Sequence, residues 1–319
     1  MHSKNKKIRF IGGIGKYGSG VIVEEFLEVL KKNYETEFHN TQSMRIKGTF
    51  SFFNSLIKER KINFFQPSVS MPAFLRDCLI NILLILFRQQ RYYILLTRLD
   101  FRNSFFKSKI FRYCFFGNSQ IFSTAKHEQI KKNFHLIRQF SPLEKIFISE
   151  NNHKSEVFLF LGYLERFKGF NEFVEVAKSN KKKNFIAIGE NYKNNLTLPR
   201  NIQLKETNGP ENFKEELIKV RKQHNPYLLY TSLSDLSPLI LLECGILKIP
   251  IICFEGGVSH QILKNYLPKD CFVAISNLKD YEISEDLIQS KKENLYKFSL
   301  DSNKHNFQNH LKKLLIQIL

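Results

Sequence analysis

Two acidic residues in the second half of the chain, Asp235 and Glu243, have the type and spacing to hold a ligand. Glu243 lies inside the apolar segment LILLECGIL, residues 239–247. A buried carboxylate without a partner destabilises a fold by several kcal/mol, so a polar group of the protein or of a ligand must meet Glu243. The alternatives are a turn role for Asp235 and a pairing of Glu243 with a core lysine or tyrosine.

The elements around these acids follow from the apolar pattern. Residues 228–230 predict a short buried strand, and the turn formers after them lead into a helix. Ser237 is predicted to cap this helix and Pro238 to take its first position, where proline's missing N–H costs nothing. The helix is predicted to end near Lys248, and the apolar residues 251–254 predict the next strand.

The start of this predicted helix has the chemistry of an anion site. The first backbone N–H groups of a helix lack intrahelical partners and lie at the positive end of the helix dipole. Residues 238–240, which include Pro238 and Leu239, are therefore predicted to suit a phosphate group.

These features resemble the retaining GT-B glycosyltransferases of the GT4 type. The shared pattern is two acids with seven residues between them, the SPL and LLE segments, and IPII followed by Gly-Gly. The resemblance implies that Glu243 holds the ribose hydroxyls of a nucleotide sugar and that Asp235 contacts the hexose of this donor. It also implies that the helix start, at Ser237, Pro238 and Leu239, holds the diphosphate.

A second part of the resemblance follows a predicted strand at 157–161. GT4 sequences have a Gly, an Arg and, six residues after the Gly, a Lys-Gly pair whose basic side chains hold the donor diphosphate. Here Lys168 matches the lysine, Tyr163 stands at the arginine position, and Arg166 in the same loop is expected to substitute. Positive charge there would offset the charge that grows on the leaving nucleotide. The alternative for Lys168 is a solvated surface lysine.

Glycines follow the first predicted strand, residues 7–11. Gly13, Gly15 and Gly18 match GxGxxG, the dinucleotide fingerprint, but the second strand ends at His39 and lacks the acid that this fingerprint requires. By resemblance, Gly13 and Gly15 belong to the glycine-rich loop that lines the cleft in GT4 enzymes. The alternative is a tight turn without a ligand.

Asp100 ends a predicted strand at 92–100, which follows a predicted apolar helix at 74–91. Open α/β sheets bind ligands at the carboxyl ends of their strands. GT4 proteins often carry a His-Asp pair there, whereas this chain has Thr97, Arg98 and Asp100. We therefore weigh a site role for Asp100 against that of a plain strand-end residue.

The net charge of +19 lies mostly in the first half. Residues 1–150 carry 25 Lys and Arg against 11 Asp and Glu, and residues 151–319 carry 24 against 19. Such a charge predicts an anionic partner, either nucleic acid, acidic lipid or a phosphorylated substrate. The segment 101–116 interleaves aromatic and basic residues, so it is either a helix on an anionic membrane or a core helix with a solvated basic face.

Strand and helix patterns alternate in both halves, which predicts an α/β protein with two doubly wound Rossmann-like domains facing a central cleft. We expect an acceptor-side domain over 1–150, a nucleotide-sugar-binding domain over 151–285, and C-terminal helices over 286–319. A linker is expected at 146–154. As in GT-B proteins, the last helix is expected to cross back to the first domain.

The resemblance implies a metal-independent retaining transfer of a hexose-like sugar, with a nucleotide diphosphate sugar as donor substrate and no cofactor. No two aspartates have the Asp-x-Asp spacing of a GT-A metal motif. The acceptor is expected to be a lipid-linked saccharide in cell-surface polysaccharide synthesis, at the inner membrane face of the cytoplasm. The five cysteines lack ligand spacing, and no apolar run suffices for a membrane span. Alternatives are an inactive donor-binding scaffold subunit and a nucleic-acid-binding protein, for which no recognition motif is found.

Overall fold

The structure is a computed structural model of the 319-residue chain. It describes residues 6–13, 19–41, 46–67, 71–95, 108–124, 133–137, 139–141, 143, 155–190, 197–235, 238–278 and 285–319. The chain divides into two compact units, a first unit of Met1–Gln139 with His305–Leu319 and a second unit of Phe140–Lys304. The predicted linker at 146–154 lies outside the described residues.

The first unit is built on a sheet of six parallel strands in the order β2-β1-β3-β4-β5-β6. The strands are β1 Lys7–Gly12, β2 Glu35–Asn40, β3 Ile62–Phe65, β4 Gln90–Leu95, β5 Gln120–Ser123 and β6 Phe134–Leu136. Its central strands are short apolar runs because helices cover the sheet on both faces.

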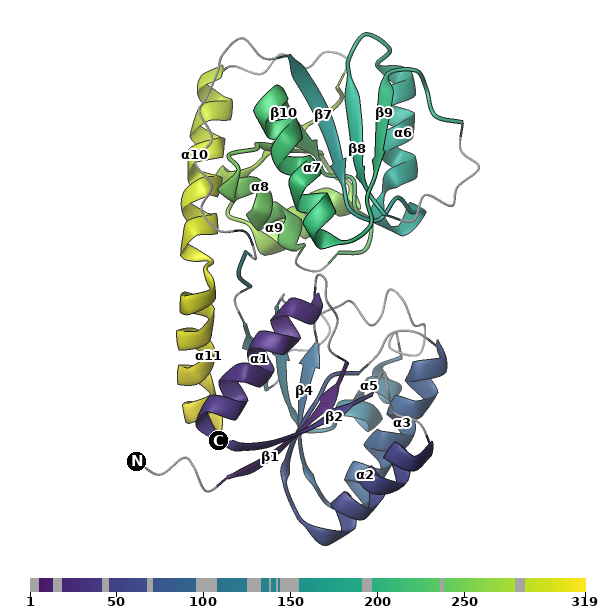
Figure 1. Ribbon diagram of the computed structural model, residues 1–319, viewed down its shortest axis with the longest axis vertical. Helices are drawn as coiled ribbons and strands as arrows, with labels where there is room; N and C mark the ends of the chain where they lie inside the picture. The colour runs from purple at the N-terminus through teal and green to yellow at the C-terminus, as the bar shows by residue number, and fades with distance from the viewer. Residues whose placement is uncertain are drawn as a thin grey trace. The chain divides into compact units, whose positions relative to one another are not determined.

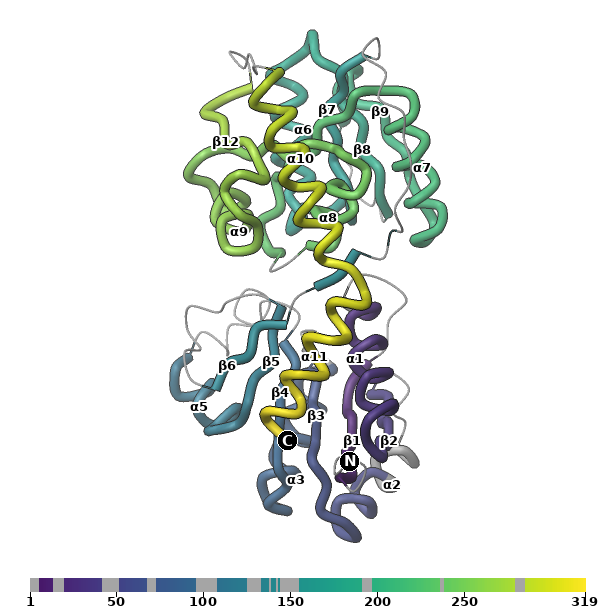
Figure 2. Tube along the Cα trace, turned by 90° about the vertical axis from the view of Figure 1, so that its left-hand side faces the viewer, coloured from purple at the N-terminus to yellow at the C-terminus, as the bar shows by residue number. Residues whose placement is uncertain are grey.

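The helices of the first unit form two layers. Helices α1 (Ser19–Asn33) and α11 (Lys304–Ile318) cover one face of the sheet, and α2 (Ile46–Lys58), α3 (Met71–Leu86) and α5 (Lys109–Phe116) cover the other (Figure 1). Figure 2 shows α11 beside α1 along the sheet. The side chain of Gln308 in α11 donates to Glu25 of α1. The last helix therefore packs within the first unit.

The structure of the first unit differs from what its sequence pattern indicates at three places. Residues 41–70 show no clear period in sequence, yet they contain α2 and the central strand β3. The helix predicted over 74–91 ends at Leu86, and Gln90 already begins β4, since an apolar run does not by itself distinguish a helix from a buried strand. The pattern of residues 119–134 predicts a strand followed by a helix, but the last of these residues, Phe134, begins β6.

Helix α5 settles part of the choice for the segment 101–116. Its residues Phe115 and Phe116 are buried in the core of the first unit, and Ile110 and Tyr113 are exposed. The interpretation that places the phenylalanine rings of this segment in a lipid interface is therefore wrong for these two rings. Residues 101–107 lie outside the described part of the chain.

The second unit repeats the architecture with a sheet of six parallel strands in the order β12-β11-β10-β7-β8-β9. The strands are β7 Glu156–Leu161, β8 Phe185–Gly189, β9 Ile202–Glu206, β10 Asn225–Leu229, β11 Ile251–Phe254 and β12 Val273–Ile275. The helices are η2 Arg166–Lys168, α6 Phe170–Ser179, α7 Pro210–Gln223, α8 Leu239–Ile246, α9 Val258–Tyr266, η3 Lys269–Cys271 and α10 Glu285–Asp301.

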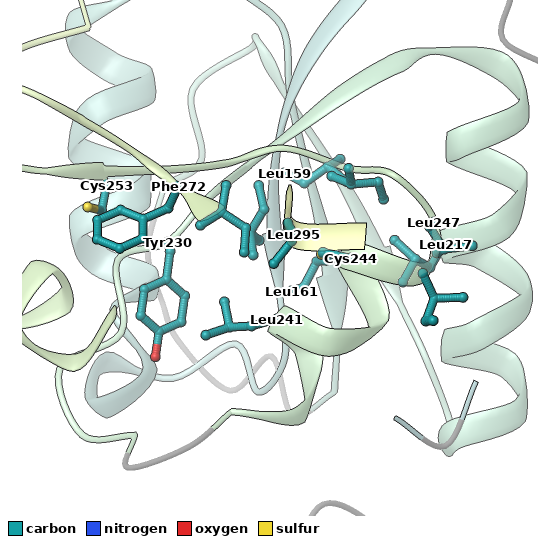
Figure 3. Close-up of a cluster of buried hydrophobic side chains, with 14 of the residues drawn as sticks. Leu159, Leu161, Leu217, Tyr230, Leu241, Cys244, Leu247, Cys253, Phe272 and Leu295 are labelled. Atoms are coloured by element: carbon teal, nitrogen blue, oxygen red, sulfur yellow. The ribbon is translucent and has the colours of Figure 1, made fainter. Parts of the chain in front are cut away.

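Alternate residues of β7 point to opposite faces of this sheet. Leu159 and Leu161 pack with α7, α8 and α9, whereas Phe158 and Phe160 pack with α6. Figure 3 shows the first of these clusters, in which Leu241 and Cys244 of α8 lie against the sheet residues and Leu295 of α10. The predicted doubly wound α/β architecture is confirmed in each unit.

Candidate functional site

The strand order of the second unit forms a topological switch point at the carboxyl ends of β7 and β10. These strands are neighbours, but the chain continues from β7 to β8 on one side and from β10 to β11 on the other. The loops after the two strands therefore leave in opposite directions, which is where open α/β sheets bind ligands. One loop contains Gly162–Gly169, and the other contains residues 230–235.

Lys168 and Asp235 meet across this switch point. The Lys168 ammonium donates to and forms an ion pair with Oδ1 of Asp235, and both side chains are largely buried, at 25% and 15% exposed. The other carboxylate oxygen of Asp235 accepts hydrogen bonds from Ser232 Oγ at 2.8 Å and Tyr230 Oη at 3.4 Å. Three groups therefore hold the Asp235 carboxylate in place. A role as a turn residue alone does not explain these contacts.

Tyr230 is a member of this site that sequence reasoning missed. Burial, and secondarily the Asp235 carboxylate, raises the pKa of Tyr230 well above its usual value. The phenol consequently stays protonated and can donate to Asp235. The available signal was the hydroxyl-rich segment YTSLS, residues 230–234, directly before the acid.

The two loops are also joined by hydrogen bonds from side-chain hydroxyls of one loop to backbone carbonyls of the other. Thr231 Oγ1 donates to the carbonyl of Gly169 at 2.8 Å, and Ser234 Oγ donates to the carbonyl of Phe167 at 3.0 Å. Gly169 has φ of 81°, and a Cβ atom there would lie 1.9 Å from the Thr231 carbonyl oxygen. A glycine is therefore required where the Lys168 loop crosses the end of β10.

We expect Gly169→Ala to destabilise the protein by about 1 to 3 kcal/mol, because the loops must separate and the new side chain must adopt a left-handed backbone. Urea denaturation measures this change. Gly256→Ala is the matched control, since Gly256 has φ of 74° but no atom within 4 Å of the added Cβ. Equal losses in the two variants would contradict the role given to the close contact at Gly169.

The helix after Asp235 differs from the prediction at both ends. Pro238 is the N-cap residue with an extended backbone, so α8 begins at Leu239 and not at Pro238. The helix ends at Ile246 and not near Lys248, which has a left-handed backbone with φ of 52°. The predicted cap Ser237 lies outside the described residues. Pro238 is buried, and Leu239 opens the first turn of α8.

Glu243 lies in the middle of α8 and is partly buried. Among the described residues, its carboxylate has no hydrogen bond or ion pair, so the pairing with a core lysine or tyrosine is not found there. Burial raises the pKa of Glu243 to about 7, and the positive charge of Lys214 in α7 only partly opposes this rise. Helical side chains tilt toward the N-terminus, so we expect the carboxylate of Glu243 to lean toward the start of α8.

The remaining predicted residues lie partly in the loop of Lys168 and partly in the first unit. Tyr163 follows β7 and is 37% exposed, and Arg166 begins η2 with an exposed side chain that makes no hydrogen bond or ion pair to another described residue. Gly13 follows β1 in the first unit. Gly15 and Asp100 lie outside the described residues. In the described ranges, no three His, Cys, Asp or Glu residues form a group that could hold a metal ion.

No family model and no curated protein matches this chain. Solved structures are similar over almost its whole length. Anabaena HepE in complex with UDP-glucose has a TM-score of 0.67 at 9% identity, with 98% of this chain and 99% of that chain covered. WaaB, a lipopolysaccharide outer core galactosyltransferase in its apo form, has a TM-score of 0.59 at 12% identity, with 98% and 100% covered.

WaaG, a glycosyltransferase involved in lipopolysaccharide biosynthesis, has a TM-score of 0.52 at 9% identity, with 96% of this chain and 99% of that chain covered. At such identities these likenesses describe the fold. The chain has the two Rossmann-like units of the GT-B architecture.

Proposed function

We propose that this protein is a glycosyltransferase that moves a hexose-like sugar from a nucleotide diphosphate sugar, as the GT4-type resemblance implies. The observation that carries the proposal is the Glu243 carboxylate, which is partly buried and makes no hydrogen bond or ion pair with a described residue. The hydroxyls of a ribose would supply the hydrogen-bond donors that this carboxylate lacks. HepE, of similar fold, was solved with UDP-glucose and with UDP, which supports uridine as the first base to test.

Lys168 is the proposed electrostatic partner of the donor diphosphate. When the donor binds, its phosphate oxygens would compete with the Asp235 carboxylate for the Lys168 ammonium. The first N–H groups of α8, from Leu239 onward, would donate to the same diphosphate. Arg166 and Tyr163 lie in the loop that leads to Lys168, and we assign them to the outer side of the phosphate site.

The proposed reaction breaks the bond between the anomeric carbon and the diphosphate oxygen and forms a bond from that carbon to an acceptor hydroxyl. The mechanism is a front-face substitution with retention, in which the leaving phosphate takes the proton of the acceptor. Lys168 would stabilise the negative charge that develops on that phosphate. Asp235, once displaced from Lys168, would accept hydrogen bonds from the donor hexose.

The acceptor side of the proposal rests on the first unit. Gly13 and Gly15 follow β1 and Asp100 follows β4, and the carboxyl ends of these strands share one edge of the sheet. We propose that these positions contact a lipid-linked or oligosaccharide acceptor in cell-surface polysaccharide synthesis. The protein would then act in the cytoplasm, at the periphery of the inner membrane face, without a metal ion or a cofactor of its own.

A second candidate function is a scaffold subunit that binds a donor and transfers nothing. Tyr163 favours it, because a neutral phenol stands where GT4 sequences carry an arginine that neutralises phosphate. The scaffold predicts nucleotide binding without release of nucleoside diphosphate. A nucleic-acid-binding function instead predicts steeply salt-dependent binding to DNA or RNA and no affinity for nucleotide sugars.

A thermal-shift screen against UDP-, GDP-, ADP- and dTDP-sugars tests the proposed function. A donor present at 100 times its Kd stabilises the protein by about 2.7 kcal/mol, so the matching base should raise Tm by several degrees. The matching sugar is then incubated with the protein and lipid-linked saccharides while nucleoside diphosphate release is measured. Stabilisation by none of the four would contradict the proposal, and stabilisation without turnover would favour the scaffold.

A further inference from the structure

The outer face of α3 in the first unit is apolar and exposed, and the proposed function makes no use of it. Four residues of this helix keep about half or more of their surface exposed, namely Leu75 at 67%, Leu79 at 52%, Ile82 at 50% and Leu86 at 69%. At 100° per residue, these side chains lie within an arc of roughly 60°. The opposite side of α3 supplies the core with Phe74, Ile80 and Leu84.

This apolar face continues onto the neighbouring helix. In α5, Ile110 and Tyr113 are 77% and 72% exposed. The two helices touch through Phe74 and Phe111, whose ring centroids are 5.7 Å apart. We call Leu75, Leu79, Ile82, Leu86, Ile110 and Tyr113 together the α3 face. Both helices belong to the same helical layer of the first unit (Figure 1).

The charge of this helical layer is positive. Helices α2, α3 and α5 contain five basic residues and one acid, Asp77. The Asp77 side chain is fully buried and pairs with Arg76 at 2.8 Å. Exposed basic side chains stand at helix ends, at Lys58 as the last residue of α2, Arg88 after α3 and Lys109 at the start of α5. Arg88 follows Leu86 by two residues and Lys109 directly precedes Ile110, and we call these three basic residues the basic rim of the α3 face.

We propose that the α3 face docks onto an anionic lipid bilayer. An amphipathic surface of this kind places its apolar side chains at the boundary of headgroups and acyl chains and its basic side chains on the phosphates. The described helices include none with the length and hydropathy of a membrane span. The docked helix would therefore lie along the interface. The exposed side chains carry this inference, which does not depend on nucleotide-sugar binding.

A second copy of this chain is the rival occupant of the same surface. An isologous interface brings identical patches together, so the basic rim of one copy would meet the basic rim of the other. Helices α2, α3 and α5 contain no acid except the buried Asp77 to compensate such repulsion. An anionic bilayer supplies the complementary charge, and it is therefore the favoured occupant.

The experiment is co-sedimentation of the full chain with vesicles of phosphatidylcholine containing about 30% phosphatidylglycerol, and with phosphatidylcholine alone. The test variant is Leu79→Glu with Ile82→Glu. The matched control is Leu287→Glu with Ile316→Glu, at two residues of α10 and α11 that are 43% and 61% exposed. We expect wild type and control to bind the anionic vesicles and the test variant to bind at least tenfold more weakly.

A second variant separates charge from apolar insertion. Lys58→Gln, Arg88→Gln and Lys109→Gln together keep the α3 face, so they should reduce the preference for anionic vesicles at least fivefold without loss of fold by circular dichroism. The proposal is overturned if wild type does not bind the anionic vesicles, or if the test variant binds as wild type does. It is also overturned if the chain forms a dimer that the test variant dissociates while vesicle binding persists.

Discussion

Glu243→Gln is expected to raise the stability of the free protein above pH 7 and to weaken nucleotide binding about 10- to 100-fold. The folded state raises the pKa of this carboxyl from 4.5 to about 7. The folded protein therefore binds more protons than the unfolded chain between these values, and stability falls as pH rises through this window. Above pH 7 the ionised carboxylate destabilises the fold by up to about 3 kcal/mol, which the neutral amide avoids.

Thermal melts of wild type and Glu243→Gln from pH 4 to 8 measure the first effect, and calorimetric titration with UDP or the matching donor measures the second. Below pH 4.5 the two melts should converge. The matched control is Glu216→Gln in α7, because the Glu216 carboxylate pairs with Lys205 at 2.8 Å and its pKa is lowered. This control should lose stability above the unfolded pKa and leave nucleotide binding unchanged.

A gain of stability together with a loss of affinity is the signature of a carboxylate retained for a ligand. If Glu243→Gln instead destabilised the protein at pH 8, Glu243 would have a structural partner. If the variant folded and bound nucleotide as tightly as wild type does, the role proposed for Glu243 toward the ribose would be contradicted.

Lys168→Ala is expected to lower the rate of transfer about 100- to 1000-fold, because the charge on the leaving diphosphate would lose the cation that we propose stabilises it. Asp235→Asn should behave differently. Removal of its negative charge frees the Lys168 ammonium and should tighten the binding of free UDP about fivefold, since a carboxylate near phosphate repels it. The same substitution should slow transfer, because the proposed contact with the donor hexose is weakened.

Initial rates and UDP titrations on both variants measure these effects. Lys178→Ala is the control for Lys168→Ala, since Lys178 is also an ion-paired lysine of the second unit, at 2.7 Å from the Glu175 carboxylate on the surface of α6. The control should change neither quantity. Weaker UDP binding in Asp235→Asn would contradict the competition of Asp235 and phosphate for Lys168.

The fold and part of the site follow from the sequence for identifiable physical reasons. Alternating strand and helix patterns predict two doubly wound units, because each parallel strand requires a crossover helix. The spacing of Asp235 and Glu243 and the match at Lys168 select the same loops that the sheet topology brings to one edge. The four-residue strand β3 is missed, because so short an apolar run carries no period.

Other features depend on contacts that the sequence does not contain. Asp235 is held by Tyr230, Ser232 and Lys168, and the last of these is 67 residues away in the chain. The sequence does not indicate which side of α3 is exposed, because nearly every position of this helix is apolar. The sequence likewise could not show that the Glu243 carboxylate makes no hydrogen bond or ion pair with a described residue, because this depends on how the helices pack.

The most direct test is an experimental structure of the protein with UDP bound. We predict that both ribose hydroxyls donate to the Glu243 carboxylate and that the diphosphate accepts from Lys168 and the first turn of α8, with Asp235 released from Lys168. A structure with the nucleotide bound elsewhere, or with Glu243 paired to Lys214 while UDP lies at the switch point between β7 and β10, would contradict the proposed function.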